Sequence, residues 1–164
     1  MSISRIIGID PGSRITGYGI IDSDGHSFHL VEAGCIRLFD STFAIRLKRL
    51  YEELSEICTQ HKPDLAAVEQ IFYARNVRSA LLLGQVRGVI LLSLISSRCE
   101  IFEYSALEVK SAVTGYGRAE KHQLRKMIEL MVHADFSSSK YDVTDALGLA
   151  LTHAQISSFR SKLK

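Results

Sequence analysis

Two short apolar segments, each ending in an acid, constrain the fold of this 164-residue chain most strongly. The first is RIIGID at residues 5–10, which a Pro-Gly pair follows, and the second is LAAVE at residues 65–69. Segments of this length that stop at turn residues are typical of buried strands. If the two strands are parallel neighbours, Asp10 and Glu69 end them at the same rim of one sheet. Ligand sites in α/β sheets lie at such carboxyl ends.

The rest of the chain changes from consecutive strands to alternating strands and helices. GYGIID at 17–22 and HSFHLVEAGCIRLF at 26–39 have extended patterns on either side of a turn signal, which predicts a three-stranded antiparallel meander for the first third. Apolar residues at helical spacing predict the later helices. In order, the later elements are a helix at 42–61, the strand at 65–69, a helix at 77–97, a strand at 100–104, a short helix ended by Gly115, a helix within 119–133, and a final helix from Asp142 to about Phe159.

This order predicts an α/β fold with a mixed five-stranded sheet, in which the first three strands are antiparallel, the later strands are parallel, and helices cover both faces. We expect residues 1–164 to form a single domain, which buries roughly 70% of the surface that the unfolded chain exposes. The segment VILLSLI at 89–95 is apolar all round, so it is predicted to be deeply buried. The apolar face of the helix within 119–133 is predicted to consist of Leu124, Met127, Ile128 and Met131.

Small residues recur every four positions in the helix at 77–97. Ala80, Gly84 and Gly88 share one face of that helix, where the lack of large side chains lets another backbone approach closely. The stripe could seat the helix on its own sheet. It could instead form the interface of a homodimer.

Basic residues are concentrated in two stretches, although the net charge of +2 is too small to establish a polyanionic partner. Arg75, Arg78 and Arg87 have no acid between them. A second stretch holds five cations against Glu120 alone: Lys110, Arg118, Lys121, Arg125 and Lys126. Such stretches suggest nucleic-acid binding, while a solvated helix face is the simpler alternative.

The three cysteines and the N-terminus bear on the cellular compartment. Cys35, Cys58 and Cys99 are an odd number and are far apart, so we expect buried thiols in a reducing cytoplasm rather than disulfides or a zinc site. The start MSISRIIGID lacks the pattern of a signal peptide, and no apolar run is expected to span a bilayer. These features predict a soluble, cytoplasmic protein.

The final helix opens with DVTDALGLAL at 142–151, which places Asp142 and Asp145 one turn apart on one face. First-turn acids are favoured by the helix dipole, and Asp142 could be a simple N-cap. If this turn packs against the rim that holds Asp10 and Glu69, four carboxylates share one small space and repel one another without a cation. Ligands that are all oxygen favour Mg²⁺ or Mn²⁺. Two such ions are the standard device for hydrolysis of a phosphodiester.

The chain resembles the RuvC-type Holliday-junction resolvases, bacterial members of the ribonuclease H-like superfamily. The resemblance covers most of the chain in the family's order. It rests on IGIDPGSRITGYGII at 7–21, AVEQIFYARNVRSALLLGQVRGV at 67–89, FEYSALEVK at 102–110, GRAEKHQL at 117–124 and DVTDALGLALTH at 142–153.

This resemblance implies a ribonuclease H-like fold and a residue-by-residue assignment of the site. Asp10, Glu69, Asp142 and Asp145 match the family's catalytic and metal-binding acids, which hold two Mg²⁺ ions that Mn²⁺ can replace. The matching DNA-contacting lysines are Lys110 and Lys121, and the aromatic matched to stacking on an unpaired base is Phe72. The basic stretches add Arg75, Arg78 and Arg118 to the predicted DNA contacts. His122 and His153 could assist proton transfer, but a surface or core role is the simpler interpretation.

The resemblance also implies the activity and the partners. The family resolves four-way DNA junctions as a homodimer that nicks two strands of like polarity and leaves 5′-phosphate ends. It acts in homologous recombination and DNA repair together with the branch-migration proteins RuvA and RuvB.

Two other classes of protein share part of these features. Actin-like ATPases and sugar kinases also begin with a strand, an acid and glycines, but their fold needs a second related domain, for which we expect 164 residues to be too few. A catalytically inactive DNA-binding scaffold would not need four acids, because such a cluster destabilises a protein that makes no use of it.

Overall fold

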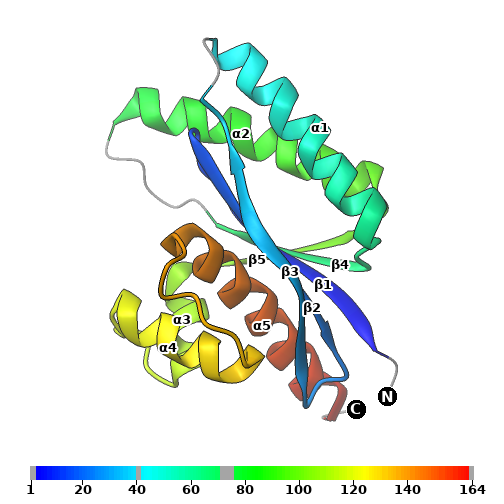
Figure 1. Cartoon of the computed structure of the whole chain (residues 1–164), viewed down its shortest axis with the longest axis vertical. Coiled ribbons are helices and arrows are strands. Elements are labelled where there is room, and N and C mark those ends of the chain that lie inside the picture. Colours follow the sequence, from blue (N-terminus) through cyan, green and yellow to red (C-terminus); the bar gives the residue numbers. More distant parts are fainter. Residues whose placement is uncertain (1–2, 40–41, 71–75, 163–164) are drawn as a thin grey trace.

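The computed structural model describes residues 3–39, 42–70 and 76–162, and residues 159–162 by their backbone alone. It consists of a central sheet and helices packed on its faces (Figure 1). The strands are β1 (Ser4–Asp10), β2 (Ile15–Ser23), β3 (Phe28–Arg37), β4 (Leu65–Glu69) and β5 (Glu100–Tyr104). The helices are α1 (Phe43–His61), α2 (Val77–Ser96), α3 (Ala106–Thr114), α4 (Lys121–Val132) and α5 (Tyr141–Lys162).

The sheet has the order β3-β2-β1-β4-β5, which confirms the predicted fold class. Strands β1, β2 and β3 form the antiparallel meander, and β4 and β5 continue the sheet in parallel with β1. Ile9 is paired with Val68, so the next residues, Asp10 and Glu69, end two adjacent parallel strands. The sheet thus brings the two acids to one rim, as the sequence predicts.

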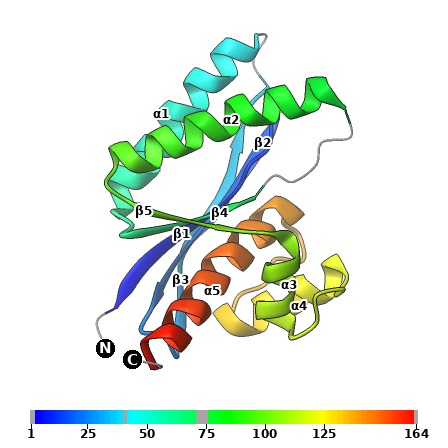
Figure 2. The ribbon, with the colours of Figure 1, turned by 180° about the vertical axis from the view of Figure 1, so that it is seen from behind.

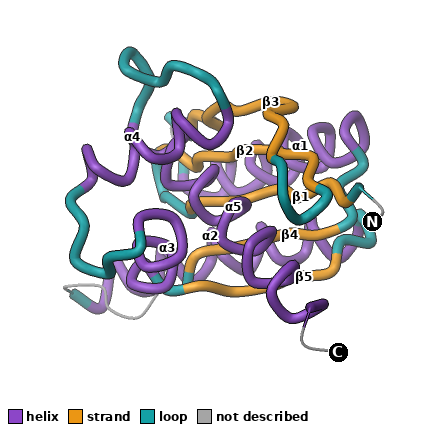
Figure 3. Tube along the Cα trace, turned by 90° about the horizontal axis from the view of Figure 1, so that it is seen from below, coloured by secondary structure: helices purple, strands orange, loops and turns teal. Residues whose placement is uncertain are grey.

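Helices cover both faces of the sheet (Figures 1 and 2). Helices α1 and α2 lie on one face, and α5 lies on the other with α3 and α4 outside it, as an end-on view also shows (Figure 3). Alternate residues of β1 enter the two cores, because successive side chains of a strand point to opposite faces. Ile7 and Ile9 belong to the core under α1 and α2, whereas Ile6 belongs to the core under α5.

Helix α2 differs from its predicted environment. Leu92 and Ile95, which were expected to be deeply buried, have 57% and 64% of their surface exposed. Only the opposite side of α2, with Val86, Ile90 and Leu94, enters the core. The prediction was wrong because a helix that is apolar all round need not be covered all round within one chain.

The glycines of α2 lie on its exposed side. A Cβ added at Gly84 or at Gly88 would meet no atom within 4 Å among the described residues. The alternative that this stripe seats the helix on its own sheet is therefore wrong. By length and composition alone, α2 could also cross a membrane, contrary to the expectation for the whole chain. The core helix of a soluble protein passes the same test. One side of α2 packs on the sheet, but only 22% of its most apolar 18-residue stretch is buried within the described residues.

Two smaller predictions also need correction. The buried face of α4 consists of Leu124, Ile128 and Val132, while Met127 is 36% exposed. Val132 continues the four-residue spacing from Leu124, which Met127 does not. Of the cysteines, Cys58 and Cys99 are buried but Cys35 is half-buried. It lies on β3, whose residues are partly exposed because α5 covers that edge strand only in part.

Candidate active site

The candidate active site lies where β1 and β4 end beneath the first turns of α5. Asp10 has the same side-chain parity as Ile6, and Glu69 has the same parity as Ala67, so both acids project from the face that α5 covers. Asp145 belongs to α5, two turns before His153. The alternation of the strands thus directs Asp10 and Glu69 toward this helix, and the other core receives the neighbouring apolar side chains.

Glycines in β1 and β2 bring α5 very close to the sheet. A Cβ added at Gly8 would lie 1.9 Å from the backbone oxygen of Ala146, and one added at Gly17 would lie 2.0 Å from that of Asp142. No other residue leaves room for this approach. Because Gly17 is paired with Asp10 in the β1–β2 ladder, the same contact carries the start of α5 to the rim of acids.

Asp10 and Glu69 lie in an environment that opposes a second negative charge. Burial, the charges of Glu69 and Asp145 and a hydrogen bond with Glu69 raise the pKa of Asp10 to about 8, with a smaller contribution from the charge of Asp142. Burial and the charge of Asp145 also raise the pKa of Glu69, against the lowering effect of the hydrogen bond from Asp10. Both carboxyl groups therefore ionise less readily than an exposed acid while no cation is bound.

Asp142 occupies the margin of this group. Its charge acts on Asp10 more weakly than that of Asp145 does, and it also acts on the thiol of Cys35, whose pKa burial and this charge raise. Helix α5 begins at Tyr141, so Asp142 lies inside the first turn and is not the N-cap. The structure therefore groups Asp10, Glu69 and Asp145 more closely than it groups Asp142 with them.

The acids fit a divalent cation by their chemistry, but not yet by their spacing. Within the described residues, no three Asp, Glu, His or Cys side chains lie close enough together to hold a metal ion as they stand. Carboxylate oxygens are nevertheless the ligands that Mg²⁺ and Mn²⁺ prefer, and a bound cation would remove the repulsion that raises the pKa of Asp10. The catalytic and metal-binding roles of the four acids stay predictions.

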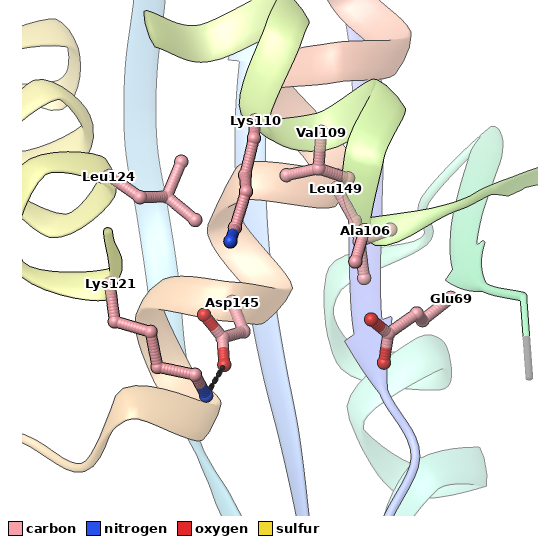
Figure 4. Close-up of a pocket in the computed structure, with 8 residues that line it drawn as sticks. All are labelled: Glu69, Ala106, Val109, Lys110, Lys121, Leu124, Asp145 and Leu149. Atoms are coloured by element: carbon pink, nitrogen blue, oxygen red, sulfur yellow. Dashed lines mark hydrogen bonds and ion pairs between the residues drawn. The ribbon is translucent and has the colours of Figure 1, made fainter. Parts of the chain in front are cut away.

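Two lysines lie directly beside the acids. The Nζ atom of Lys121, at the start of α4, donates to Oδ2 of Asp145 at 3.1 Å. This carboxylate and those of Asp10 and Asp142 raise the pKa of Lys121 against the effect of burial. Figure 4 shows that the amino group of Lys110, on α3, also points toward Asp145, while Glu69 faces the same space from the opposite side. Two of the six predicted DNA contacts thus adjoin the acids.

These side chains line a small pocket of about 160 Å³. Its walls are mostly apolar, and its charged groups are two acids and two lysines. The lining residues are Glu69, Ala106, Val109, Lys110, Lys121, Leu124, Asp145 and Leu149 (Figure 4). The pocket thus brings two lysines and two carboxylates to one small space.

The other predicted DNA contacts lie outside the pocket. Arg78 is exposed in the first turn of α2, and Arg118 is exposed in the connection between α3 and α4. Phe72 and Arg75 lie outside the described residues. The two histidines have the simpler roles: His122 is exposed beside Glu120, and His153 is buried, with Nδ1 2.7 Å from the Tyr104 hydroxyl.

Sequence reasoning named Arg125 and Arg87 as parts of basic stretches but missed how these two side chains shape the site. Arg125 stacks 3.9 Å from the ring centroid of Tyr141 and donates to the backbone oxygen of Ser139, which fixes the approach to α5. Arg87 of α2 donates to the backbone oxygen of Glu69 at 2.7 Å. Arg87 was noticed only as part of a basic stretch, since no sequence signal indicates that its side chain points inward.

Solved structures identify the fold class. The structure is similar to that of "T. thermophilus RuvC in complex with Holliday junction substrate", with a TM-score of 0.91 and 24% identity over 96% of this chain and 97% of that chain. It is also similar to the yeast mitochondrial Holliday junction resolvase Ydc2, with a TM-score of 0.71 and 13% identity over 98% of this chain and 82% of that chain. The fold is therefore ribonuclease H-like.

Sequence comparison identifies the family within that class. Residues 6–153 match the family described as "Crossover junction endodeoxyribonuclease RuvC". The chain is 46% identical over 160 residues to the protein of that name from Pelotomaculum thermopropionicum, which covers 97% of this chain and 98% of the relative. It is 45% identical over 152 residues to that from Serratia proteamaculans, with coverage of 93% and 87%. The chain belongs to the RuvC family.

Proposed function

We propose that this protein is an endonuclease that resolves Holliday (four-way) DNA junctions by Mg²⁺-dependent hydrolysis of phosphodiester bonds. The observation that carries this proposal is the convergence of Asp10, Glu69 and Asp145 at one rim of the sheet, in a chain of the RuvC family. The raised pKa of Asp10 supports it, because a group of acids that repel one another is stabilised by a bound cation. Residues 1–164 act as one ribonuclease H-like domain.

The four acids would hold two Mg²⁺ ions, which Mn²⁺ could replace: Asp10, Glu69, Asp142 and Asp145. When bound, such ions supply an activated water and stabilise the leaving oxygen, and cleavage leaves 5′-phosphate ends. The chain's own part is to fix the carboxylates on two strands and one helix, so that they need little rearrangement. Lys121 would release Asp145 when a cation takes its place, and then contact the phosphate next to the cleaved bond together with Lys110.

The DNA would reach the site along the basic side chains of α3 and α4. Lys110 and Lys121 stand at the acids, and Arg118 is exposed in the connection between the two helices. Two arginines and one aromatic residue precede or begin α2: Arg75, Arg78 and Phe72. Near the centre of the junction, the arginines would contact phosphates and the aromatic ring would stack on a splayed base.

The exposed side of α2 would form a homodimer interface. Gly84 and Gly88 leave open space, and four large apolar side chains flank them on the exposed surface: Val77 (77%), Leu81 (62%), Leu92 (57%) and Ile95 (64%). Exposed apolar residues in one stripe are typical of a helix that packs against a partner. A two-fold dimer matches a junction with two equivalent strands, so the two sites would make paired symmetrical nicks in strands of like polarity.

The cellular setting follows from this activity. The protein would act in the cytoplasm in homologous recombination and DNA repair, after the branch-migration proteins RuvA and RuvB have positioned the junction. No membrane contact is needed for this role.

Cleavage of a synthetic four-way junction tests the proposed chemistry. Changing Asp10→Asn or Asp145→Asn should abolish cleavage in Mg²⁺ while junction binding in Ca²⁺ stays within about threefold of the unchanged protein. Asp24→Asn, in the exposed β2–β3 turn, is the matched control and should cleave normally. Full activity of either rim variant would refute the assignment of the metal-binding acids.

The mass of the protein in solution tests the interface. Leu92→Glu places a charge in the exposed stripe and should convert a dimer into a monomer in light scattering. Leu130→Glu, on the exposed side of α4, is the matched control and should leave the mass unchanged. A Leu92→Glu variant with the unchanged mass of a dimer would place the interface elsewhere.

A further inference from the structure

Arg87 connects helix α2 to the end of strand β4. One guanidinium nitrogen, Nη1, donates to the backbone oxygen of Glu69 at 2.7 Å. The other, Nη2, forms an ion pair with Oε1 of Glu103 on β5. The Arg87 side chain is 18% exposed, whereas the Glu103 side chain is 41% exposed, so solvent and salt reach the ion pair from the Glu103 side.

The peptide bond after Glu69 is held from two sides. Its carbonyl accepts the bond from Arg87, and its N–H, which belongs to Gln70, donates to the backbone oxygen of Tyr104 at 2.8 Å. Both polar groups of one peptide unit are thus fixed at the point where β4 ends. A fixed peptide plane sets the direction of the Cα–Cβ bond of Glu69, and hence the direction in which its carboxylate leaves the strand.

Arg87 lies in the same turn of α2 as Gly84 and Gly88, which are on the exposed side of the helix. Gly84 and Gly88 precede and follow Arg87, and their surfaces face open space. The turn therefore presents the exposed stripe on one side and the bond to Glu69 on the other. Arg87 is thus a direct link between this turn of α2 and the strand end that carries Glu69.

A purely structural role would explain only one of the two interactions of Arg87. The ion pair with Glu103 alone would attach α2 to the edge strand β5. The second bond, however, goes to the backbone of an acid that faces Asp10 and Asp145, and not to another surface side chain. Groups that orient a metal ligand in this way change metal affinity when they are removed.

We propose that Arg87 is a positioning residue, which holds the carboxylate of Glu69 toward the other acids and joins the exposed face of α2 to the candidate metal site. This inference rests on the proposed function of the acids. Arg87 does not touch the substrate or the metal ion; it acts through the Glu69 peptide.

Two variants that remove the donors of Arg87 test the inference. Arg87→Gln keeps a polar side chain, and Arg87→Met keeps an apolar stem that can pack under α2. Mn²⁺ binding is measured by titration calorimetry without DNA, and cleavage is measured as a function of Mg²⁺ concentration. Each variant should bind Mn²⁺ about 10-fold to 100-fold more weakly, and half-maximal cleavage should need more Mg²⁺ by a similar factor. Junction affinity in EDTA should stay within about twofold.

Glu103→Gln is the matched control, because it removes the ion pair but leaves the bond from Arg87 to the Glu69 carbonyl available. It should bind Mn²⁺ within about threefold of the unchanged protein, although its melting temperature can fall. A folded Arg87 variant that binds Mn²⁺ as the unchanged protein does would overturn the inference. So would a Glu103→Gln variant that loses as much Mn²⁺ affinity as Arg87→Met, because attachment of α2 would then be the whole effect.

The unchanged protein separates the two possible failures. If it neither binds Mn²⁺ nor cleaves junctions, the proposed function fails and the inference fails with it. If it binds and cleaves, and Asp145→Asn does neither, but both Arg87 variants behave normally, only the role of Arg87 is overturned.

Discussion

The charged side chains at the two ends of strand β1 lie in opposite electrostatic environments. Near its start, Arg5 makes two bonds of 2.7 Å to the carboxylate of Asp22, and its other donors reach the backbone of His61 and the carboxylate of Asp64. At its end, Asp10 faces Glu69 and Asp145, and the nearby cation, Lys121, bonds to Asp145. At the start of the strand each acid accepts a hydrogen bond from Arg5, whereas at its end the acids face one another with few cations.

The pKa values follow this difference. The guanidinium of Arg5 lowers the pKa of Asp22, whereas burial and like charges raise the pKa of Asp10 to about 8. The start of the strand therefore gains stability from its acids, and the end loses stability to them in the absence of a cation. The same strand thus contributes to folding at one end and prepares a cation site at the other, and four predictions test this contrast.

The largest expected difference between the two ends is in catalysis. Strand β4 lies parallel to β1, so its acids lie beside the two ends of β1. Glu69 ends β4, and Asp64 lies just before its start, where it accepts a hydrogen bond from Arg5. Glu69→Gln should slow cleavage of a four-way junction by about 1,000-fold, because removing one ligand of a catalytic metal weakens the whole site. Asp64→Asn should leave the rate within about threefold. Single-turnover rates with saturating enzyme measure both, and a Glu69→Gln variant with a tenth of the normal rate would contradict the contrast.

Divalent cations should stabilise the protein through the rim alone. At about 100 times its dissociation constant, Mg²⁺ or Mn²⁺ should add about 2.7 kcal/mol and raise the melting temperature by roughly 5–10 °C. Asp145→Asn should lose most of this shift, and Asp22→Asn should keep it. Differential scanning fluorimetry with and without EDTA gives both values. An equal shift in the two variants would mean that the cations bind elsewhere.

The stability of the metal-free protein should depend on pH with opposite signs at the two ends. Asp10 has a raised pKa, so its destabilising effect is absent below its ordinary value of 3.8 and grows as the pH rises toward about 8. Asp22 has a lowered pKa, so its stabilising effect is present above its ordinary value and is lost as the pH falls through the lowered one.

Asp10→Asn should therefore melt about 4 °C above the unchanged protein at pH 8 in EDTA, and close to it at pH 4.5. Melting curves across this range measure the difference. An Asp10→Asn advantage that does not change with pH would show that a cause other than the charge of Asp10 is responsible.

The smallest expected effect belongs to the paired end of the strand. Asp22→Asn removes the charge from a partly exposed bidentate pair and should destabilise the protein by about 1 kcal/mol, or roughly 3 °C in the melting temperature. Cleavage at 25 °C should be unaffected. Asp24→Asn in the adjacent turn is a control for the loss of one acid. A loss of cleavage in Asp22→Asn without loss of stability would contradict the claim that the start of β1 contributes to stability and its end to catalysis.

The sequence predicted most of the fold because the local patterns agree with the final arrangement. The apolar strands, the antiparallel meander and the five helices lie near their predicted bounds. The adjacency of Asp10 and Glu69 followed from the rule for strand ends and is confirmed by the β1–β4 register. The exposure of Leu92 and Ile95 was not predictable, because hydrophobicity does not tell whether the same chain or a partner covers a residue.

The site was predictable only where its residues follow an element's own geometry. Asp145 was placed correctly beside Asp10 and Glu69, because helical spacing sets its direction. The bonds of Lys121 to Asp145 and of Arg87 to Glu69 join residues 24 and 18 positions apart, so they depend on how the helices pack. The need for glycine at positions 8 and 17 likewise appears only once α5 lies on the sheet.

A crystal soaked in Mn²⁺ tests the central claim most directly, through the anomalous scattering of the metal. Mn²⁺ should lie within about 2.2 Å of carboxylate oxygens of Asp10, Glu69 and Asp145, with the Lys121 amino group moved away from Asp145. Mn²⁺ density that avoids these three carboxylates, with Lys121 still bonded to Asp145, would contradict the claim that this rim is a cation site.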